Sequence, residues 1–123
     1  QDSQPDCRAH LTQIVALYPT LHADSPMFPA QPFSLMHTAM LRRSQSGTPI
    51  NPSEAIDAHQ ALRAMTINAA YQLRQDSLLG SLEPGKWADL TVVSDNPYRM
   101  PPTQLQQMRV NAVYLGGRQV YGD

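Results

Sequence analysis

GSLEPGKWADLTVVSDNP, residues 80–97, is the stretch that decides how this chain folds. Pro84 and Gly85 suit the two central positions of a type II turn, because proline presets the first φ and glycine accepts the positive second φ. The β-branched residues of DLTVV (89–93) then predict a strand. The sequence therefore changes from helical to strand periodicity at this point.

The end of the chain continues the sheet. RVNAVYLGGRQVY (109–121) contains two strand-like runs joined by Gly116-Gly117, which predicts a hairpin since glycine tolerates positive φ. TQLQQM (103–108) is expected to form one helical turn. Three short strands do not enclose a core of their own. We therefore expect their partner strands to lie outside this chain.

Two amphipathic helices are expected upstream. PFSLMHTAMLRR (32–43) repeats apolar residues at helical spacing. NPSE predicts the start of a second helix over 52–74, with Asn51 as the cap and Glu54 reaching back to it. The buried stripe expected for this helix is Ala55, Ala58, Leu62, Met65, Ala69 and Leu73.

The first part of the chain is expected to hold a short helix at 6–17 and a buried strand at 19–23. A lone strand leaves its backbone groups unpaired, so this strand also needs neighbours from elsewhere. Helices and strands occupy separate stretches, which predicts an α+β chain. We expect a division near residue 78, with 1–78 and 79–123 as its two parts.

Composition narrows the class of protein. The 123 residues carry a net charge of -1 and no basic run, which argues against nucleic acid as a partner. No apolar run reaches the roughly 18 residues that span a membrane. Cys7 is the only cysteine, so no intramolecular disulfide is expected, which fits a reducing compartment. We expect a cytoplasmic location, with an exported parent as the alternative, and a chain starting at Gln1 is expected to be a processed or partial product.

LHADSPMFP (21–29) raises the question of chemistry. His22 and Asp24 are two residues apart, so a strand would point both side chains the same way. They fit a pair of metal ligands, a proton-transfer pair, or the polar end of an ordinary strand. An aspartate in a proline-rich turn is common, and these residues alone favour such a structural role over metal chemistry.

Four segments in this order resemble one family. They are LHADSPMFPAQP (21–32), ALRAMTINAAYQL (61–73), the run 80–97 and VNAVYLGGRQVY (110–121). Together they resemble the C-terminal part of metal-dependent amidohydrolases, in particular the branch that includes N-substituted formamide deformylases.

The resemblance implies a parent enzyme with a (β/α)8 barrel and a small β-sandwich built from both chain ends. Residues 1–78 would then hold the last barrel strand and helices, and 79–123 the C-terminal sandwich strands. It also implies a divalent metal, with zinc expected, and a small amide or formamide-like substrate. The implied reaction is hydrolysis of a C–N bond by metal-activated water.

The same resemblance assigns roles near the barrel mouth. Asp24 matches the family position that binds the metal and takes the proton of the attacking water. His22 is expected to orient the loop rather than to bind the metal, and both His22 and Ser25 are weak candidates for substrate contact. His37 is expected to be a hydrogen-bonded core residue, and His10 and His59 to have surface or packing roles.

Several family features lie outside this chain. The His-x-His pair of the first barrel strand is absent from the 123 residues, and a catalytic zinc needs about three protein ligands. We therefore expect the isolated chain to be inactive and to need the N-terminal part of the same protein. The alternative is a non-catalytic α+β module that pairs through exposed strand edges. Those edges also predict a homo-oligomer.

Overall fold

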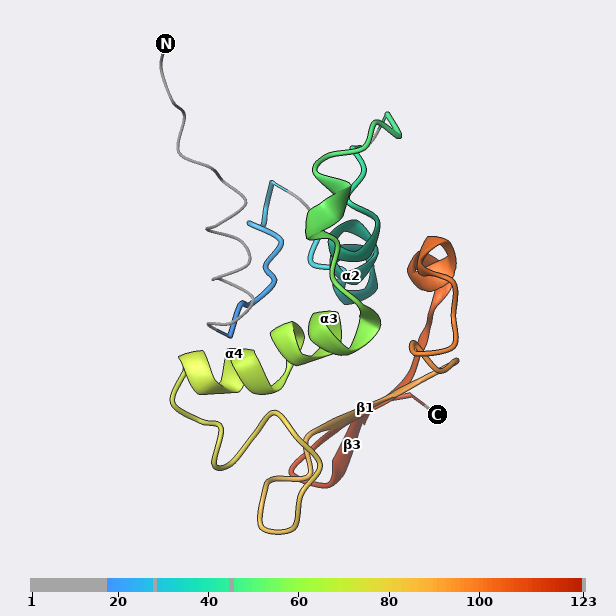
Figure 1. The fold of residues 1–123 in the computed structure, drawn as a ribbon. Coiled ribbons are helices and arrows are strands. Elements are labelled where there is room, and N and C mark those ends of the chain that lie inside the picture. Colours follow the sequence, from blue (N-terminus) through green and yellow to red (C-terminus); the bar gives the residue numbers. More distant parts are fainter. Residues whose placement is uncertain (1–17, 28, 45, 123) are drawn as a thin grey trace.

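The computed structural model describes residues 18–27, 29–44 and 46–122. The helix expected at 6–17, with Cys7 and His10, lies outside these residues. The described part is a small α+β structure, in which helices lie on one side and three antiparallel strands on the other (Figure 1).

Helix α2 spans Pro32–Leu41 and confirms the first predicted helix. Pro32 lies in the first turn, where its missing N–H would have no helical partner. The helix ends where Arg42 adopts a left-handed conformation with φ 50° and donates its backbone N–H to Thr38 O at 2.9 Å. Leu41 is thus the last helical residue, two residues before the predicted end.

The predicted helix 52–74 is wrong in its start and in its continuity. Its span is a 3-10 turn η1 (Pro52–Glu54), helix α3 (Ala58–Met65) and helix α4 (Ile67–Gln72). The cap is Asp57, which accepts from Gln60 N at 2.8 Å, while Gln60 Oε1 accepts from Asp57 N at 3.0 Å.

Two side-chain contacts explain these differences. Glu54 does not reach back to Asn51 because its carboxylate accepts from Arg42 Nη2 at 2.9 Å. Thr66 separates α3 from α4, and its hydroxyl donates to Leu62 O at 2.7 Å. Such a bond to the preceding turn competes with regular helix geometry and bends helices.

The break at Thr66 also changes which face is buried. The predicted stripe is wrong in part. Leu62 and Met65 pack against the core as predicted, but the buried residues of α3 and α4 are Ala61, Ala64, Asn68 and Ala70, and Leu73 is 71% exposed. The core consists of Met36 from α2, Ala61 from α3, and Leu105 and Met108 from the region of η2 (Pro102–Gln107). Turn η2 confirms the predicted helical turn.

The sheet confirms the strand predictions. Strands β1 (Leu90–Val93), β2 (Val110–Leu115) and β3 (Arg118–Tyr121) pair antiparallel in the order β1-β2-β3. Leu90 pairs with Tyr114, and Val113 with Tyr121. Gly85 has φ 93°, and Lys86 N donates to Glu83 O at 3.2 Å, as the predicted turn requires.

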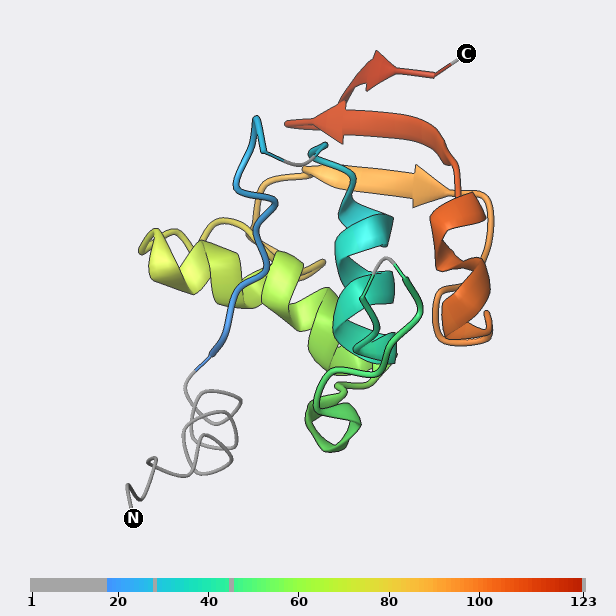
Figure 2. The ribbon, with the colours of Figure 1, turned by 90° about the horizontal axis from the view of Figure 1, so that it is seen from above.

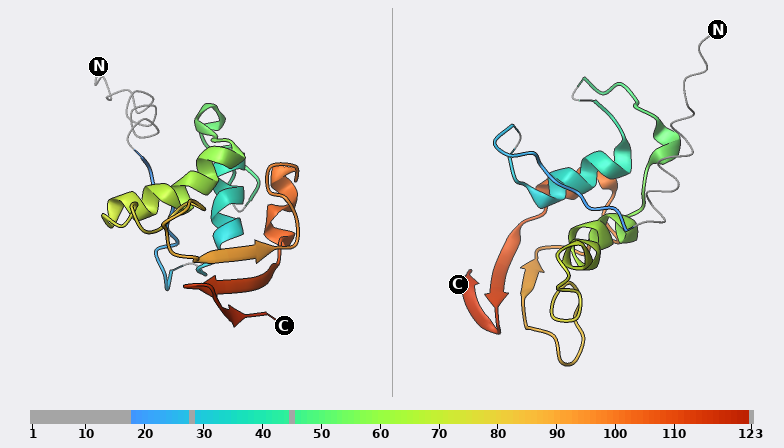
Figure 3. Two further views of the ribbon diagram at one scale, coloured as in Figure 1. Left: turned by 90° about the horizontal axis from the view of Figure 1, so that it is seen from below. Right: turned by 90° about the vertical axis from the view of Figure 1, so that its left-hand side faces the viewer.

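Strand β3 is the edge strand of this sheet that lies away from the helices. Figures 2 and 3 show β1 beside the helices and β3 farthest from them. All four residues of β3 are exposed. Val93 of β1 packs against the core, so the core draws on residues from both sides of residue 78. The division of the chain at that residue stays a prediction.

The strand predicted at 19–23 does not form. The segment has no strand pairing and instead contacts α4 as it crosses the helix (Figure 2). Asn68 Nδ2 donates to Pro19 O at 3.0 Å, and Thr20 Oγ1 donates to Gln72 Oε1 at 3.1 Å. The prediction fails because a strand requires a neighbouring ladder, and the described residues bring none to this segment.

Candidate functional site

The turn at residues 24–27 carries the residue that the sequence favoured. Asp24 has a left-handed backbone with φ 51°, and Met27 N donates to Asp24 O at 2.9 Å, which closes the turn. The Ser25–Pro26 peptide bond is cis. His22, Asp24 and Ser25 are all exposed. The turn therefore displays a carboxylate, an imidazole and a hydroxyl to the surroundings.

His22 and Asp24 contact each other, but not through the carboxylate. The backbone N–H of Asp24 donates to His22 Nδ1 at 3.2 Å. Sequence reasoning placed both side chains on one side of a strand, and that geometry is wrong because the strand is absent. The two residues are brought together by the turn instead. The imidazole thus contacts the main chain that holds the Asp24 carboxylate.

Whether this turn can hold a metal depends on which metal-binding side chains lie near it. A carboxylate oxygen is a suitable ligand for zinc and for other divalent ions. Over the described ranges, no group of three or more His, Cys, Asp or Glu side chains lies close enough to hold a metal ion. Asp24 therefore fits as one ligand of a metal whose other ligands come from elsewhere.

The other described histidines have structural partners. His37 is half-buried, and its Nδ1 accepts from Gln106 Nε2 at 3.1 Å. His59 is exposed and lies 3.1 Å from the hydroxyl of Tyr98. The surface position of His59 agrees with the role expected for it. His37 is hydrogen-bonded as expected, but it is half-buried and does not belong to the core.

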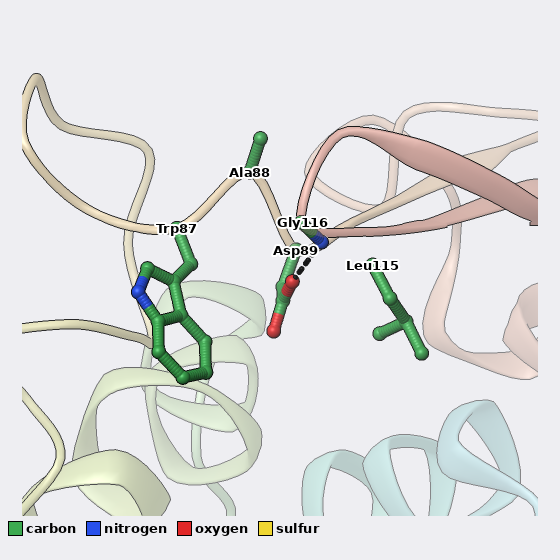
Figure 4. A pocket seen from close by; sticks show the side chains of 5 residues that line it. All are labelled: Trp87, Ala88, Asp89, Leu115 and Gly116. Atoms are coloured by element: carbon green, nitrogen blue, oxygen red, sulfur yellow. Dashed lines mark hydrogen bonds between the residues drawn. The ribbon is translucent and has the colours of Figure 1, made fainter.

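A second feature, which sequence reasoning missed, is an open hollow of about 560 Å³ at one end of the sheet. Trp87, Ala88, Asp89, Leu115 and Gly116 line it. Figure 4 shows the side chains of Trp87, Asp89 and Leu115 pointing to one side of the chain. Trp87 is 58% exposed.

The only titratable side chain that lines the hollow is already engaged. Asp89 Oδ1 accepts from Gly116 N at 2.6 Å, the dashed bond in Figure 4. Gly117 N also donates to Ala88 O at 2.9 Å. These bonds fasten the segment before β1 to the β2–β3 turn. The hollow is therefore a structural junction, and the chemistry points to the turn at Asp24.

The profile of the amidohydrolase family matches residues 17–121, which include this turn and the whole sheet. The chain belongs to the amidohydrolase family. In the part of this amidohydrolase chain that the structure describes, no helix is long and apolar enough to cross a membrane.

Individual relatives agree with the family. The N-substituted formamide deformylase of Arthrobacter pascens is 36% identical over 98 residues, which cover 80% of this chain and 18% of that protein. The 5-methylthioadenosine/S-adenosylhomocysteine deaminase of Teredinibacter turnerae is 43% identical over 75 residues, 54% of this chain and 17% of that protein. Both names describe enzymes that act on C–N bonds.

A solved structure shares the fold. The crystal structure of an amidohydrolase from Thermotoga maritima superposes with a TM-score of 0.64 and 28% identity, covering 85% of this chain and 23% of that one. The chain thus spans about a fifth of the length of the proteins it matches. It is similar to a part of each of these proteins, and the family match over residues 17–121 includes Asp24.

Proposed function

We propose that this chain is the C-terminal part of a metal-dependent amidohydrolase that hydrolyses the C–N bond of an amide or formamide-like small molecule. The observation that carries the proposal is the exposed Asp24 carboxylate in a hydrogen-bonded turn. It lies within a family match that spans most of the chain. The deformylase relative supports a formamide-like substrate.

In this proposal Asp24 performs two tasks. Its carboxylate would help to hold a divalent metal, with zinc the expected ion, and the bound ion would supply a more acidic water. The carboxylate would also accept the proton of the attacking water and pass it to the departing amine nitrogen. Ser25 lies beside Asp24 in the turn and is a weak candidate for hydrogen bonding to the substrate.

The remaining ligands belong to the N-terminal part of the same protein. In this proposal residues 1–78 complete a (β/α)8 barrel and residues 79–123 complete a small β-sandwich. Two observations support it. The segment 18–23 has no strand partner among the described residues, and the outer strand β3 is fully exposed.

In this proposal the active site is divided between this chain and the N-terminal part of the protein. Measuring hydrolysis by the isolated chain tests that division. The 123 residues, with zinc added, are expected to hydrolyse an N-formyl amine no faster than zinc in buffer, because one ligand does not hold a catalytic metal. The protein encoded by the whole reading frame is the matched control. Clear zinc-dependent turnover by the isolated chain would overturn the proposal.

Strand β3 favours a second candidate, a non-catalytic module that pairs with another copy of this chain. Its four residues are exposed, and Val120 and Tyr121 are 47% and 59% exposed. An unprotected strand edge offers N–H and C=O groups to a further strand. Arg118 is the only charged residue in β3.

Light scattering tests this pairing. The isolated chain is expected to form a dimer that Val120→Lys converts to a monomer, because an edge lysine opposes pairing. Thr103→Lys, at an exposed position of turn η2, is the matched control and should remain dimeric. A wild-type chain that stays monomeric at high concentration would exclude the homo-oligomer.

A further inference from the structure

We infer that His22 is a positioning residue for Asp24 and not a second metal ligand; this inference rests on the proposed function. The observation is the bond from the backbone N–H of Asp24 to His22 Nδ1, 3.2 Å long. A backbone amide only donates, so Nδ1 must present its lone pair. In the neutral ring the proton then resides on Nε2.

This tautomer decides what His22 does. A metal ligand needs a lone pair on the nitrogen that binds. Nδ1 uses its lone pair for the Asp24 amide, and Nε2 carries the hydrogen. Neither nitrogen of this neutral ring therefore binds a metal while the bond to Asp24 is in place. Among the residues that the structure describes, this turn therefore supplies Asp24 as its metal ligand.

The same bond holds Asp24 in an unusual conformation. A left-handed backbone is unfavourable for residues other than glycine, although aspartate tolerates it through local hydrogen bonds. The Asp24 backbone is bonded on both sides, by its N–H to His22 and by its carbonyl to Met27 N. These two bonds fix the peptide units from which the carboxylate projects. His22 thus sets the direction of the ligand without touching the metal.

A matched pair of substitutions separates positioning from ligation. Asparagine at position 22 places an oxygen near the site of Nδ1, and asparagine side chains commonly accept the amide two residues further on. Leucine fills similar space and offers no acceptor. His22→Asn should therefore keep the bond to Asp24, while His22→Leu should lose it.

Hydrogen exchange of the Asp24 amide, measured by NMR on the 123-residue chain, reads the bond directly. We expect exchange in wild type and His22→Asn to be slower than in His22→Leu by about threefold or more, as for an amide released from a local bond. The Met27 amide, bonded to Asp24 O, reports whether the turn itself persists. Equal Asp24 exchange in wild type and His22→Leu would overturn the inference.

Zinc affinity of the protein encoded by the whole reading frame gives the second readout. His22→Asn should bind zinc as wild type does, and His22→Leu should bind it about 10–100-fold more weakly, the range for lost orienting contacts. Equal loss in both variants would identify His22 as a ligand and overturn the inference. If wild type binds no zinc, the proposed function fails, whereas the exchange pattern still tests the His22–Asp24 bond.

Discussion

The carboxylate of Asp89 accepts a 2.6 Å hydrogen bond from the backbone N–H of Gly116, 27 residues further along the chain. The bond joins the segment before β1 to the turn between β2 and β3. Its acceptor is charged, and such bonds contribute more than neutral ones. The aspartate of GKWAD is therefore the residue that joins the entry of the sheet to its last hairpin.

Asp89→Ala is expected to lower the free energy of unfolding by about 1–3 kcal/mol, because it leaves the Gly116 amide without its partner. Urea denaturation followed by circular dichroism measures the change. Asp95→Ala, at an exposed position, is the control and should change stability by about 0.5 kcal/mol or less. Equal stability of the two variants would show that the Asp89 bond is unimportant.

Lys86 anchors the Pro84-Gly85 turn to a different part of the chain, the segment 76–81 that follows α4. Its ammonium group donates to the carbonyl of Asp76 and to Ser81 Oγ, the latter at 2.7 Å, and its side chain is 11% exposed. Lys86→Met should cost about 2–4 kcal/mol, since bonds to a charged donor contribute about 1.5–3 kcal/mol each and are partly replaced by water. Thermal unfolding measures this, and a loss no greater than that of exposed Arg99→Met would contradict it.

Two residues compete as the N-cap that begins helix α3: Asp57, which caps it in the structure, and Asn51, which the sequence predicted. Asp57→Ala should lower stability by about 1 kcal/mol, because it removes the carboxylate that accepts from Gln60 N. The backbone N–H of residue 57, which donates to Gln60 Oε1, is kept. Asn51→Gly should leave stability nearly unchanged, since Asn51 makes no cap bond and its left-handed φ of 44° suits glycine. If Asn51→Gly proved the more damaging variant in urea denaturation, the helix would begin where the sequence suggested.

Alanine substitutions at Gly47 and Gly80 separate the cost of backbone strain from the cost of steric crowding, because the two glycines have nearly the same φ. Gly47 and Gly80 have φ of 85° and 88°, so alanine is strained at both. An added Cβ at Gly47 meets nothing within 4 Å, whereas at Gly80 it meets Ile67 Cα at 2.7 Å and Ala70 Cβ at 2.8 Å. Gly80→Ala should therefore destabilise by about 1–3 kcal/mol more than Gly47→Ala. Equal unfolding temperatures would mean that α4 does not pack against residue 80.

Local signals predicted most of the second half of the chain. The turn at Pro84-Gly85, strand β1, turn η2 and the hairpin at Gly116-Gly117 all follow from backbone preferences of a few neighbouring residues. Helix α2 follows from its apolar spacing and from Pro32. These elements depend little on distant parts of the molecule.

The predictions that failed depend on contacts between residues that are far apart in the sequence. Glu54 was expected to cap its own helix, but Arg42, twelve residues away, binds its carboxylate. The strand at 19–23 required neighbours that the described residues do not provide. In each case a residue's neighbours in space, and not in sequence, decided the outcome.

The candidate site was predictable in part. The family resemblance, and not the residues alone, singled out Asp24 as a ligand and disfavoured His22, and the sequence pattern placed both on a strand. The contact between the Asp24 amide and the imidazole depends on the left-handed turn, which residue types alone did not indicate. The assignment of Asp24 as metal ligand and base stays a proposal.

The most direct test of the divided site is the effect of Asp24→Asn on zinc-dependent hydrolysis of an N-formyl amine by the protein of the whole reading frame. Asparagine keeps the shape and removes the charge that binds the metal and accepts the proton. We predict a loss of kcat/KM of about 10³-fold or more, since proton transfer alone contributes about 10²–10⁴-fold. Wild-type turnover by Asp24→Asn would contradict the account.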